Sequence, residues 1–226
     1  MMQNEILYSP SYSLLRLLME PGEAVLAESG AMVSMTPNIG VQTAAKGGLL
    51  GGLKRSLLGG ESFFINTFTC AGGQGELTLA PSLPGDMMHI PLAGGTMMVQ
   101  SGSFVASTPT INTDTSWAGA KGFFAKQGLF LLKCEGSGDL FVSSYGAIHM
   151  VQLAAGQGYV VDTGHVVAFE ATMSYNVRAV GGLKQTLFSG EGLVSEFAGP
   201  GRLYLQTRSL EAFLGVIIPR LPKSSS

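Results

Sequence analysis

Short runs of apolar and β-branched residues, separated by glycine, proline and asparagine, recur along most of the chain. Runs of this kind, with turn residues between them, are typical of β-strands. Residues 12–19 form a first predicted strand that ends at a Glu-Pro-Gly turn, and residues 24–27 form the next. The pattern predicts an all-β protein with many short strands, arranged as a barrel, a prism or a β-helix.

Helical spacing of apolar residues is confined to two short segments, 49–58 and 210–218. One charge-free, apolar-leaning stretch, 140–161, is interrupted by serines, glutamines, a histidine and glycines. A membrane-spanning helix needs about 20 mainly apolar residues, so paired strands explain this stretch better. Residues 219–226 contain two prolines and a serine run, and we expect them to form a flexible tail.

A Ser/Thr-Gly pair occurs three times, at 29–30, 101–102 and 163–164. A polar residue precedes each pair, and apolar residues follow three and nine positions after each glycine. In the three copies these are Glu28, Val33 and Ile39; Gln100, Val105 and Ile111; and Asp162, Val167 and Met173. The spacing predicts one domain, 1–226, built of three repeats at about 12–86, 87–152 and 153–218, in a closed pseudo-threefold arrangement.

Each predicted repeat also contains a Gly-x-Gly sequence, at 73–75, 136–138 and 199–201. Such a sequence can cradle the phosphates of a dinucleotide, but that site needs a helix after the turn. An alternating, strand-like run follows here instead. We therefore expect hairpin turns, in which glycine supplies a positive φ.

Several motifs resemble the altered-inheritance-of-mitochondria 24 family, a former domain of unknown function. They are Glu-Pro-Gly-Glu at 20–23, Glu-Ser-Gly-Ala-Met-Val-Ser-Met at 28–35, Gly-Gly-Leu at 51–53, Gly-Glu-Ser-Phe-Phe at 60–64, and Ala-Pro at 80–81 with Pro-Gly-Asp at 84–86. The resemblance covers about residues 6–219. It implies a double-stranded β-helix similar in fold to the tryptophan RNA-binding attenuation protein, and no established enzymatic activity. Fold does not fix function, so tryptophan and RNA binding are not carried over.

Charged residues make up only 12% of the chain and apolar residues 46%. Since about 25% charged residues is usual, apolar surface is left over, and burial in a homo-oligomer is its simplest use. The net charge of −2 disfavours nucleic acid as a partner. Residues 1–4 show no signal peptide, so we expect a cytoplasmic protein, with a peripheral membrane location as an option.

Three loops combine bulky apolar residues with cations, and six of the 13 Lys and Arg residues fall in them. An apolar surface ringed by cations can dock on an anionic membrane or on a protein partner. The alternative is that each loop folds its apolar residues onto its own barrel. The candidate docking residues are Lys54, Arg55, Leu57, Leu58, Lys121, Phe123, Phe124, Lys184, Leu187 and Phe188.

Other candidate sites have simpler structural interpretations. Glu61, Gln127 and Glu191 occupy matching positions and could bind a cation, but hydrogen bonding to neighbouring backbone is the better explanation. His89, His149 and His165 are far apart and do not form a metal-ligand pattern. Cys70 and Cys134 are expected to be reduced and to behave as small apolar residues. We expect no metal, no cofactor and no catalytic group.

These observations favour a non-catalytic, self-associating scaffold or interaction protein, which could dock on a protein partner or a membrane through the apolar-basic loops. The alternative is a small-ligand sensor with an apolar pocket inside the β-helix. An enzyme is the least favoured interpretation, because its residues would have to assemble across the repeats.

Overall fold

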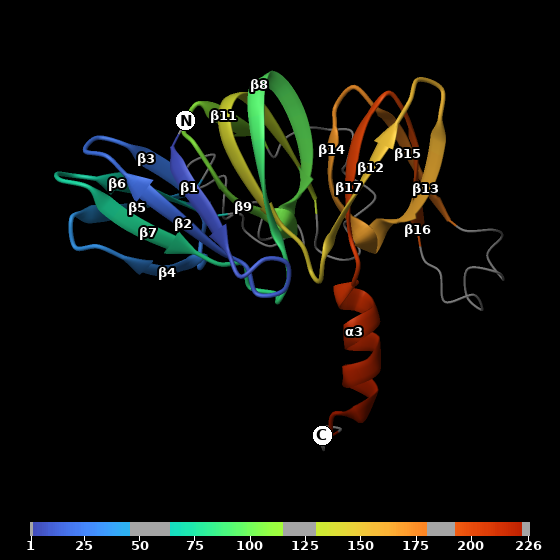
Figure 1. Cartoon of the computed structure of the whole chain (residues 1–226). Helices are drawn as coiled ribbons and strands as arrows, with labels where there is room; N and C mark the ends of the chain where they lie inside the picture. Colours follow the sequence, from blue (N-terminus) through green and yellow to red (C-terminus); the bar gives the residue numbers. More distant parts are fainter. Residues whose placement is uncertain (1, 46–63, 115–129, 180–192, 223–226) are drawn as a thin grey trace.

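The computed structural model describes residues 2–45, 64–114, 130–179 and 193–222. Within these ranges the chain is mostly antiparallel β-sheet, with one α-helix close to the C-terminus (Figure 1). The all-β class predicted from the apolar pattern is therefore confirmed. The predicted helix at 49–58 lies outside the described residues.

The first third of the chain forms two groups of strands. In one group β7 lies between β2 and β4, and β1 covers the outer side of β2. In the other, β6 lies between β3 and β5. The strands are β1 (Gln3–Leu7), β2 (Leu14–Met19), β3 (Ala24–Glu28), β4 (Met32–Met35), β5 (Ile39–Ala45), β6 (Phe64–Cys70) and β7 (Gly75–Leu79).

The middle third is built on two long strands that pair along their whole length, β8 (Met87–Gln100) and β11 (Leu131–Ser143). The second half of β11 lies between the start of β8 and β9 (Phe104–Ser107). The first half of β11 lies between the end of β8 and β10 (Ile111–Asp114). A single 3-10 turn, Ser101–Ser103, joins β8 to β9.

The last third again forms two groups. Strand β17 lies between β12 and β14, and β16 lies between β13 and β15. The strands are β12 (Ile148–Leu153), β13 (Gly158–Asp162), β14 (Val166–Glu170), β15 (Ser174–Ala179), β16 (Leu193–Ala198) and β17 (Gly201–Gln206). The first and last thirds thus pair their strands in the same order. The middle third differs because successive strands are joined into the long continuous strands β8 and β11.

Two junctions connect neighbouring thirds. Strand β9 pairs with β3, and β14 pairs with β8, so most strands join into one ten-stranded sheet. Two smaller sheets remain separate: β1-β2-β7-β4, and β13-β16-β15. Figure 1 places β4 and β13 at opposite ends of the molecule. Ring closure, which the repeats predict, needs one more pairing, and the described strands do not make it.

The Gly-x-Gly prediction of hairpins is wrong. The strands on either side of these sequences do not pair with each other, because β6 and β7, and likewise β16 and β17, pair with different neighbours. In the middle third the sequence lies inside β11, at a register shift between Glu135 and Ser137. The glycines therefore mark the place where the chain passes from one group of strands to the other.

Close approach of the turn between β9 and β10 explains the second glycine of the middle copy. Gly138 has φ 153°, and a Cβ at this position would lie 2.1 Å from Thr108 Oγ1. No side chain fits in that space, so glycine is required.

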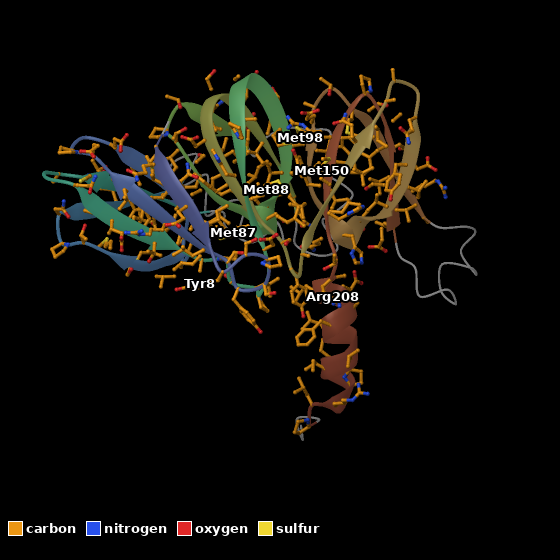
Figure 2. The ribbon with its side chains drawn as sticks, in the orientation of Figure 1. Tyr8, Met87, Met88, Met98, Met150 and Arg208 are labelled. Atoms are coloured by element: carbon orange, nitrogen blue, oxygen red, sulfur yellow. The ribbon has the colours of Figure 1, made fainter. Side chains whose placement is uncertain are left out.

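Three clusters of buried apolar side chains form the core, and all three cross a junction, the third by joining Met98 (Figure 2) and Leu131 of the middle third to residues of the last third. The first combines residues of the first third with Val105, Ala106 and Phe141. The second combines residues of the middle third with Val167, Ala168 and Tyr204. The neighbouring thirds therefore share core side chains as well as strand pairing.

The C-terminal segment begins with α3 (Leu210–Ile217), followed by a 3-10 turn at Ile218–Arg220. This confirms the helical spacing read from 210–218. Helix α3 points away from the sheets (Figure 1), and none of its residues is buried. Of the expected flexible tail, Pro219 and Arg220 belong to the 3-10 turn, and residues 223–226 lie outside the described part.

Candidate functional site

The loops predicted to dock on a partner or membrane lie outside the described residues. All ten candidates fall in 46–63, 115–129 and 180–192, as do Glu61, Gln127 and Glu191. They are Lys54, Arg55, Leu57, Leu58, Lys121, Phe123, Phe124, Lys184, Leu187 and Phe188. Their docking role therefore stays a prediction.

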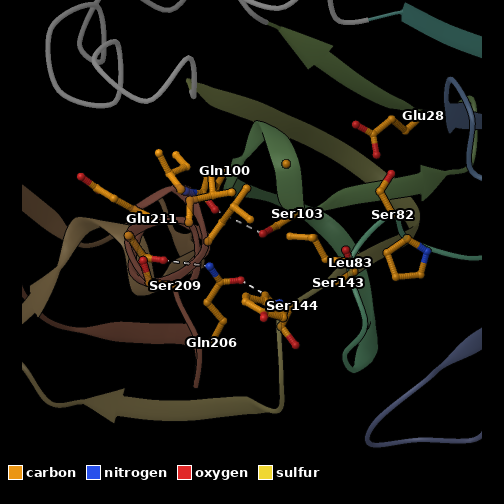
Figure 3. Close-up of a pocket in the computed structure, with 18 residues that line it drawn as sticks. Glu28, Ser82, Leu83, Gln100, Ser103, Ser143, Ser144, Gln206, Ser209 and Glu211 are labelled. Carbon is orange, nitrogen blue, oxygen red and sulfur yellow. Dashed lines mark hydrogen bonds between the residues drawn. The ribbon is translucent and has the colours of Figure 1, made fainter. Parts of the chain in front are cut away.

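A pocket of about 670 Å³ lies where the three thirds of the chain meet, beside α3 (Figure 3). Glu28 and Gln100 end β3 and β8, and Gly164 follows β13, so three Ser/Thr-Gly turns converge on it. Residues that follow β7, β11 and β17, among them Ser82, Ser144 and Ser209, also line it. Pockets of about 300–1,000 Å³ are the usual size of small-molecule sites.

One wall of the pocket is apolar and belongs to α3. Leu210, Leu214 and Ile218 lie one helical turn apart and face the pocket, with Leu83 and Pro81 among the other apolar lining residues. The helix begins at Ser209, whose Oγ accepts the N–H of Ala212 at 3.4 Å. A serine cap of this kind fixes the first turn of a helix.

Gln100 is the polar group of the pocket with the most distinctive surroundings. Its side chain is 3% exposed, its Oε1 accepts Ser103 Oγ at 3.4 Å, and its Nε2 has no hydrogen-bond partner among the described residues. The matching residue of the last third, Asp162, instead caps its own 3-10 turn by accepting the N–H of Gly164 at 2.8 Å. Gln100 makes no such cap.

A buried amide N–H without a partner is costly in a folded protein. Since Gln100 lines the pocket, a hydrogen-bond acceptor inside the pocket would satisfy it. The sequence marks this position only as a polar residue before a Ser-Gly pair. Its signal is the amide in a place where the other two copies carry a carboxylate.

Gln206, also in the pocket wall, has a structural role. Its Nε2 donates to Gly164 O at 2.8 Å, and its Oε1 accepts the N–H of Tyr145 at 2.9 Å. Its backbone carbonyl accepts His165 Nδ1 at 2.7 Å. This network ties the end of β17 to the turns on both sides, so it shapes the pocket.

The described histidines do not come together. His89 Nε2 lies 2.8 Å from Asp139 Oδ1, and its ring stacks on Phe141 at 5.0 Å. Asp139 also accepts the backbone N–H of Met2 at 3.2 Å, so this pair ties the N-terminal segment to the core. His149 is exposed, and His165 belongs to the Gln206 network. Among the described residues, no group of three or more His, Cys, Asp or Glu side chains could hold a metal ion.

Both cysteines are buried and neither forms a disulfide, in line with the expected reduced, small apolar side chains. Cys70 packs in the first core cluster and Cys134 in the second, where each behaves as a small apolar side chain. In the part of the chain that the structure describes, no helix is long and apolar enough to cross a bilayer.

Comparison with known proteins agrees with the family resemblance of the motifs. The family model described as mitochondrial biogenesis AIM24 matches residues 4–208. An uncharacterized protein of Streptococcus pyogenes serotype M6 is 32% identical, over 96% of this chain and 90% of its own length. A crystal structure of a Streptococcus pyogenes protein superposes with a TM-score of 0.81 at 31% identity, covering 98% of this chain and 100% of that chain. From its motifs, its fold and these matches, the chain belongs to the AIM24 family.

Proposed function

We propose that this protein is a non-catalytic, self-associating interaction protein. The observation that carries the proposal is α3, an apolar helix with no buried residue. Its exposed side chains include Phe213, Val216 and Ile217, and Ile218 and Leu221 continue the surface beyond it.

An exposed apolar surface of this kind is unfavourable in water. Burying apolar area stabilises a complex by about 25 cal/mol per Å² before the costs of association are counted. Helices that are apolar on most sides are normally buried against another element. The low charge of the whole chain supports the same proposal, since it leaves little to keep separate copies apart.

Light scattering coupled to gel filtration tests the proposal. We expect a mass above that of one chain at micromolar concentration. Val216→Glu should lower that mass, because it places a carboxylate in the apolar surface. Ala212→Glu is the matched control, since it adds the same charge to the same helix without removing a large apolar side chain. A strictly monomeric wild-type protein would overturn the proposal.

Docking through the three apolar-basic loops is a separate part of the proposal. It rests on the sequence pattern of Lys54, Arg55 and Lys184 with their apolar neighbours. Flotation with vesicles of anionic lipid tests it: replacing these three cations by glutamate should abolish flotation, and unchanged flotation would refute membrane docking.

The pocket favours small-ligand binding as a second candidate function. Its apolar wall and the unpartnered Nε2 of Gln100 suit an uncharged amphiphile with a carbonyl oxygen. A medium-chain monoacylglycerol is a suitable probe in calorimetry. Gln100→Leu should weaken its binding about fivefold, the effect of one neutral hydrogen bond. Equal binding by both proteins would remove this candidate.

We further propose that the fold is a β-helix of three repeats, 12–86, 87–152 and 153–218. The shared order of strand pairing supports it, as does burial of Ile39, Ile111 and Met173, which occupy one position of the repeat. An experimental structure whose three segments superpose strand on strand is the expected result.

A further inference from the structure

The two junctions between thirds are made in the same way. In one, Ala27 of β3 lies opposite Ala106 of β9; in the other, Val99 of β8 lies opposite Ala168 of β14. When the three Ser/Thr-Gly pairs are aligned, Ala27 matches Val99, and Ala106 matches Ala168. The same positions therefore meet with the same register each time.

By this alignment, β4 and β13 occupy the positions of junction strands but have no junction partner. Strand β4 matches β9 and β14, but it pairs only with β7. Strand β13 matches β3 and the end of β8, but it pairs only with β16. Each is an edge strand in the part of the chain that the structure describes, with its outer hydrogen-bonding groups facing away from its sheet.

Burial shows what β4 lacks. Met32 and Val33 of β4 are 43% and 57% exposed. The side chains at the matching positions in the two existing junctions are fully buried. They are Phe104 and Val105 in β9, and Val166 and Val167 in β14, each 0% exposed. An apolar position that is buried in two of the repeats and exposed in the third indicates that a neighbouring strand is missing there.

Strand β13 shows the same contrast. Tyr159 and Val160 are 38% and 55% exposed. At the position of Tyr159 the other two copies have Val25 and Met97, both 1% exposed, and at the position of Val160 the middle copy has Met98, 4% exposed. Exposure of large apolar groups is thus found on the two edges that would complete a junction.

We infer that β13 of one copy of this chain pairs antiparallel with β4 of a second copy, with Val161 opposite Ser34 and Val160 opposite Met35. The inference rests on the proposed self-association and adds to it a second contact surface, separate from α3. The three-stranded sheet β13-β16-β15 and the four-stranded sheet β1-β2-β7-β4 become one continuous sheet. It contains three strands from each side, as at the other two junctions, with β1 added at its edge.

A second copy is the occupant because the chain itself carries both halves of the junction. The halves lie at opposite ends of the molecule (Figure 1), so the pairing joins different molecules. Such a head-to-tail contact differs from a twofold dimer contact, because each copy offers one β4 edge and one β13 edge. Repetition gives either a closed ring or an open filament, and a ring closes between chains rather than among the three repeats of one chain.

Disulfide trapping tests the register. Two double variants place cysteines opposite each other: Ser34→Cys with Val161→Cys, and Met35→Cys with Val160→Cys. Opposed pairs alternate between wide and narrow Cα separation in antiparallel sheets, so testing both covers either geometry. With diamide as oxidant, we expect multimers of linked chains on non-reducing gels. Ser34→Cys with Val160→Cys is the off-register control, because its two side chains leave opposite faces of the sheet.

Charge substitution tests the same contact without a cross-link. Val33→Lys and Val160→Lys each add a cation to an exposed edge, so folding should be unaffected while the mass in light scattering falls. Val41→Lys is the matched control, since Val41 is an exposed residue of β5, an edge strand outside the proposed contact.

The results separate this inference from the proposed function. An assembled protein that forms no in-register cross-link, and whose mass is unchanged by Val33→Lys, would overturn the β4–β13 contact and leave self-association standing. A wild-type protein that stays monomeric would overturn both. Cross-linking in register together with loss of assembly in Val33→Lys supports the contact.

Discussion

At the scale of single residues, the fold depends on a few positions where no substitute fits. Gly138 is one of them, because its φ of 153° and its approach to Thr108 both disfavour a side chain. The sequence identifies this glycine through its recurrence at 75, 138 and 201. It does not reveal that the reason is close approach of the turn between β9 and β10 rather than a hairpin turn at the glycine itself.

Replacing Gly138 with alanine tests this reason. We expect Gly138→Ala to lower the free energy of unfolding by about 2–4 kcal/mol, because backbone strain and a steric clash add together. Urea unfolding followed by circular dichroism measures the change. Gly95→Ala is the control: a Cβ there meets nothing within 4 Å, so its effect should be small. Similar losses in both variants would contradict the argument.

Tyr175 makes the stability of the folded protein depend on pH in the alkaline range. Burial among Phe169 and Phe197 raises the pKa of the Tyr175 hydroxyl to about 12. The folded state therefore holds this proton more tightly than the unfolded state, whose pKa is about 10. Its contribution to stability is complete below pH 10 and is lost as the pH rises toward 12.

We expect Tyr175→Phe to remove part of the stability loss between pH 10 and 12. Urea unfolding at pH 9 and pH 11 gives the measurement, and the difference between the two pH values should be smaller for the variant than for the wild type. Tyr204→Phe serves as a comparison, since burial also raises the pKa of Tyr204. Identical pH differences in Tyr175→Phe and the wild type would rule out this role.

At the scale of elements, α3 differs from every strand because its helical conformation depends more on the residues near it in sequence than on contacts with other elements. Ser209 caps its first turn and its spacing is apolar, so it could be predicted from sequence. No residue of the helix is buried in the chain itself. Its contacts with the rest of the chain are few, the ring contact of Phe213 with Tyr145 at 6.1 Å among them, so its stability should depend mainly on local propensity.

Two substitutions in α3 should act in opposite directions. Ser209→Ala removes the cap and should destabilise the helix by about 1 kcal/mol. Gly215→Ala meets no atom within 4 Å and should stabilise it by about the same amount. Hydrogen exchange of the amides of α3 reports both, with no matching change in β17. Coupled changes in α3 and the sheets would contradict this dependence on local propensity.

Some strands are easier to predict from the sequence than others. Periodicity and turns locate β2, β3 and the strands of 140–161, since these carry their own signals. Strand β1 was not predicted, because its only support is pairing with β2. The pocket could not be predicted either: its walls come from turns far apart in sequence, and only the three-dimensional fold brings Gln100 near α3.

At the scale of the whole molecule, shared core clusters make neighbouring thirds depend on one another. Phe141 shows this best, because it belongs to the middle third and packs in the core of the first. The repeat markers in the sequence predict three similar units. They do not predict that each unit borrows side chains from the next, since that depends on the junction geometry.

We expect the described sheets to unfold in one cooperative transition. Phe141→Ala should lower the free energy of unfolding by about 3–5 kcal/mol, the usual effect of removing a buried aromatic ring. Calorimetry should show a single peak that moves to lower temperature. Two separated peaks, with only one of them shifted, would mean that the thirds unfold independently.

The burial of both native thiols has a practical consequence. Cys70 and Cys134 are the only cysteines in the chain, and both lie inside the core. A maleimide dye or a nitroxide applied to the folded protein would therefore react with a newly introduced cysteine and spare the native ones. Placed at the exposed Val41, outside the proposed contacts, such a reporter would allow subunit exchange to be followed by fluorescence or electron spin resonance without prior removal of native cysteines.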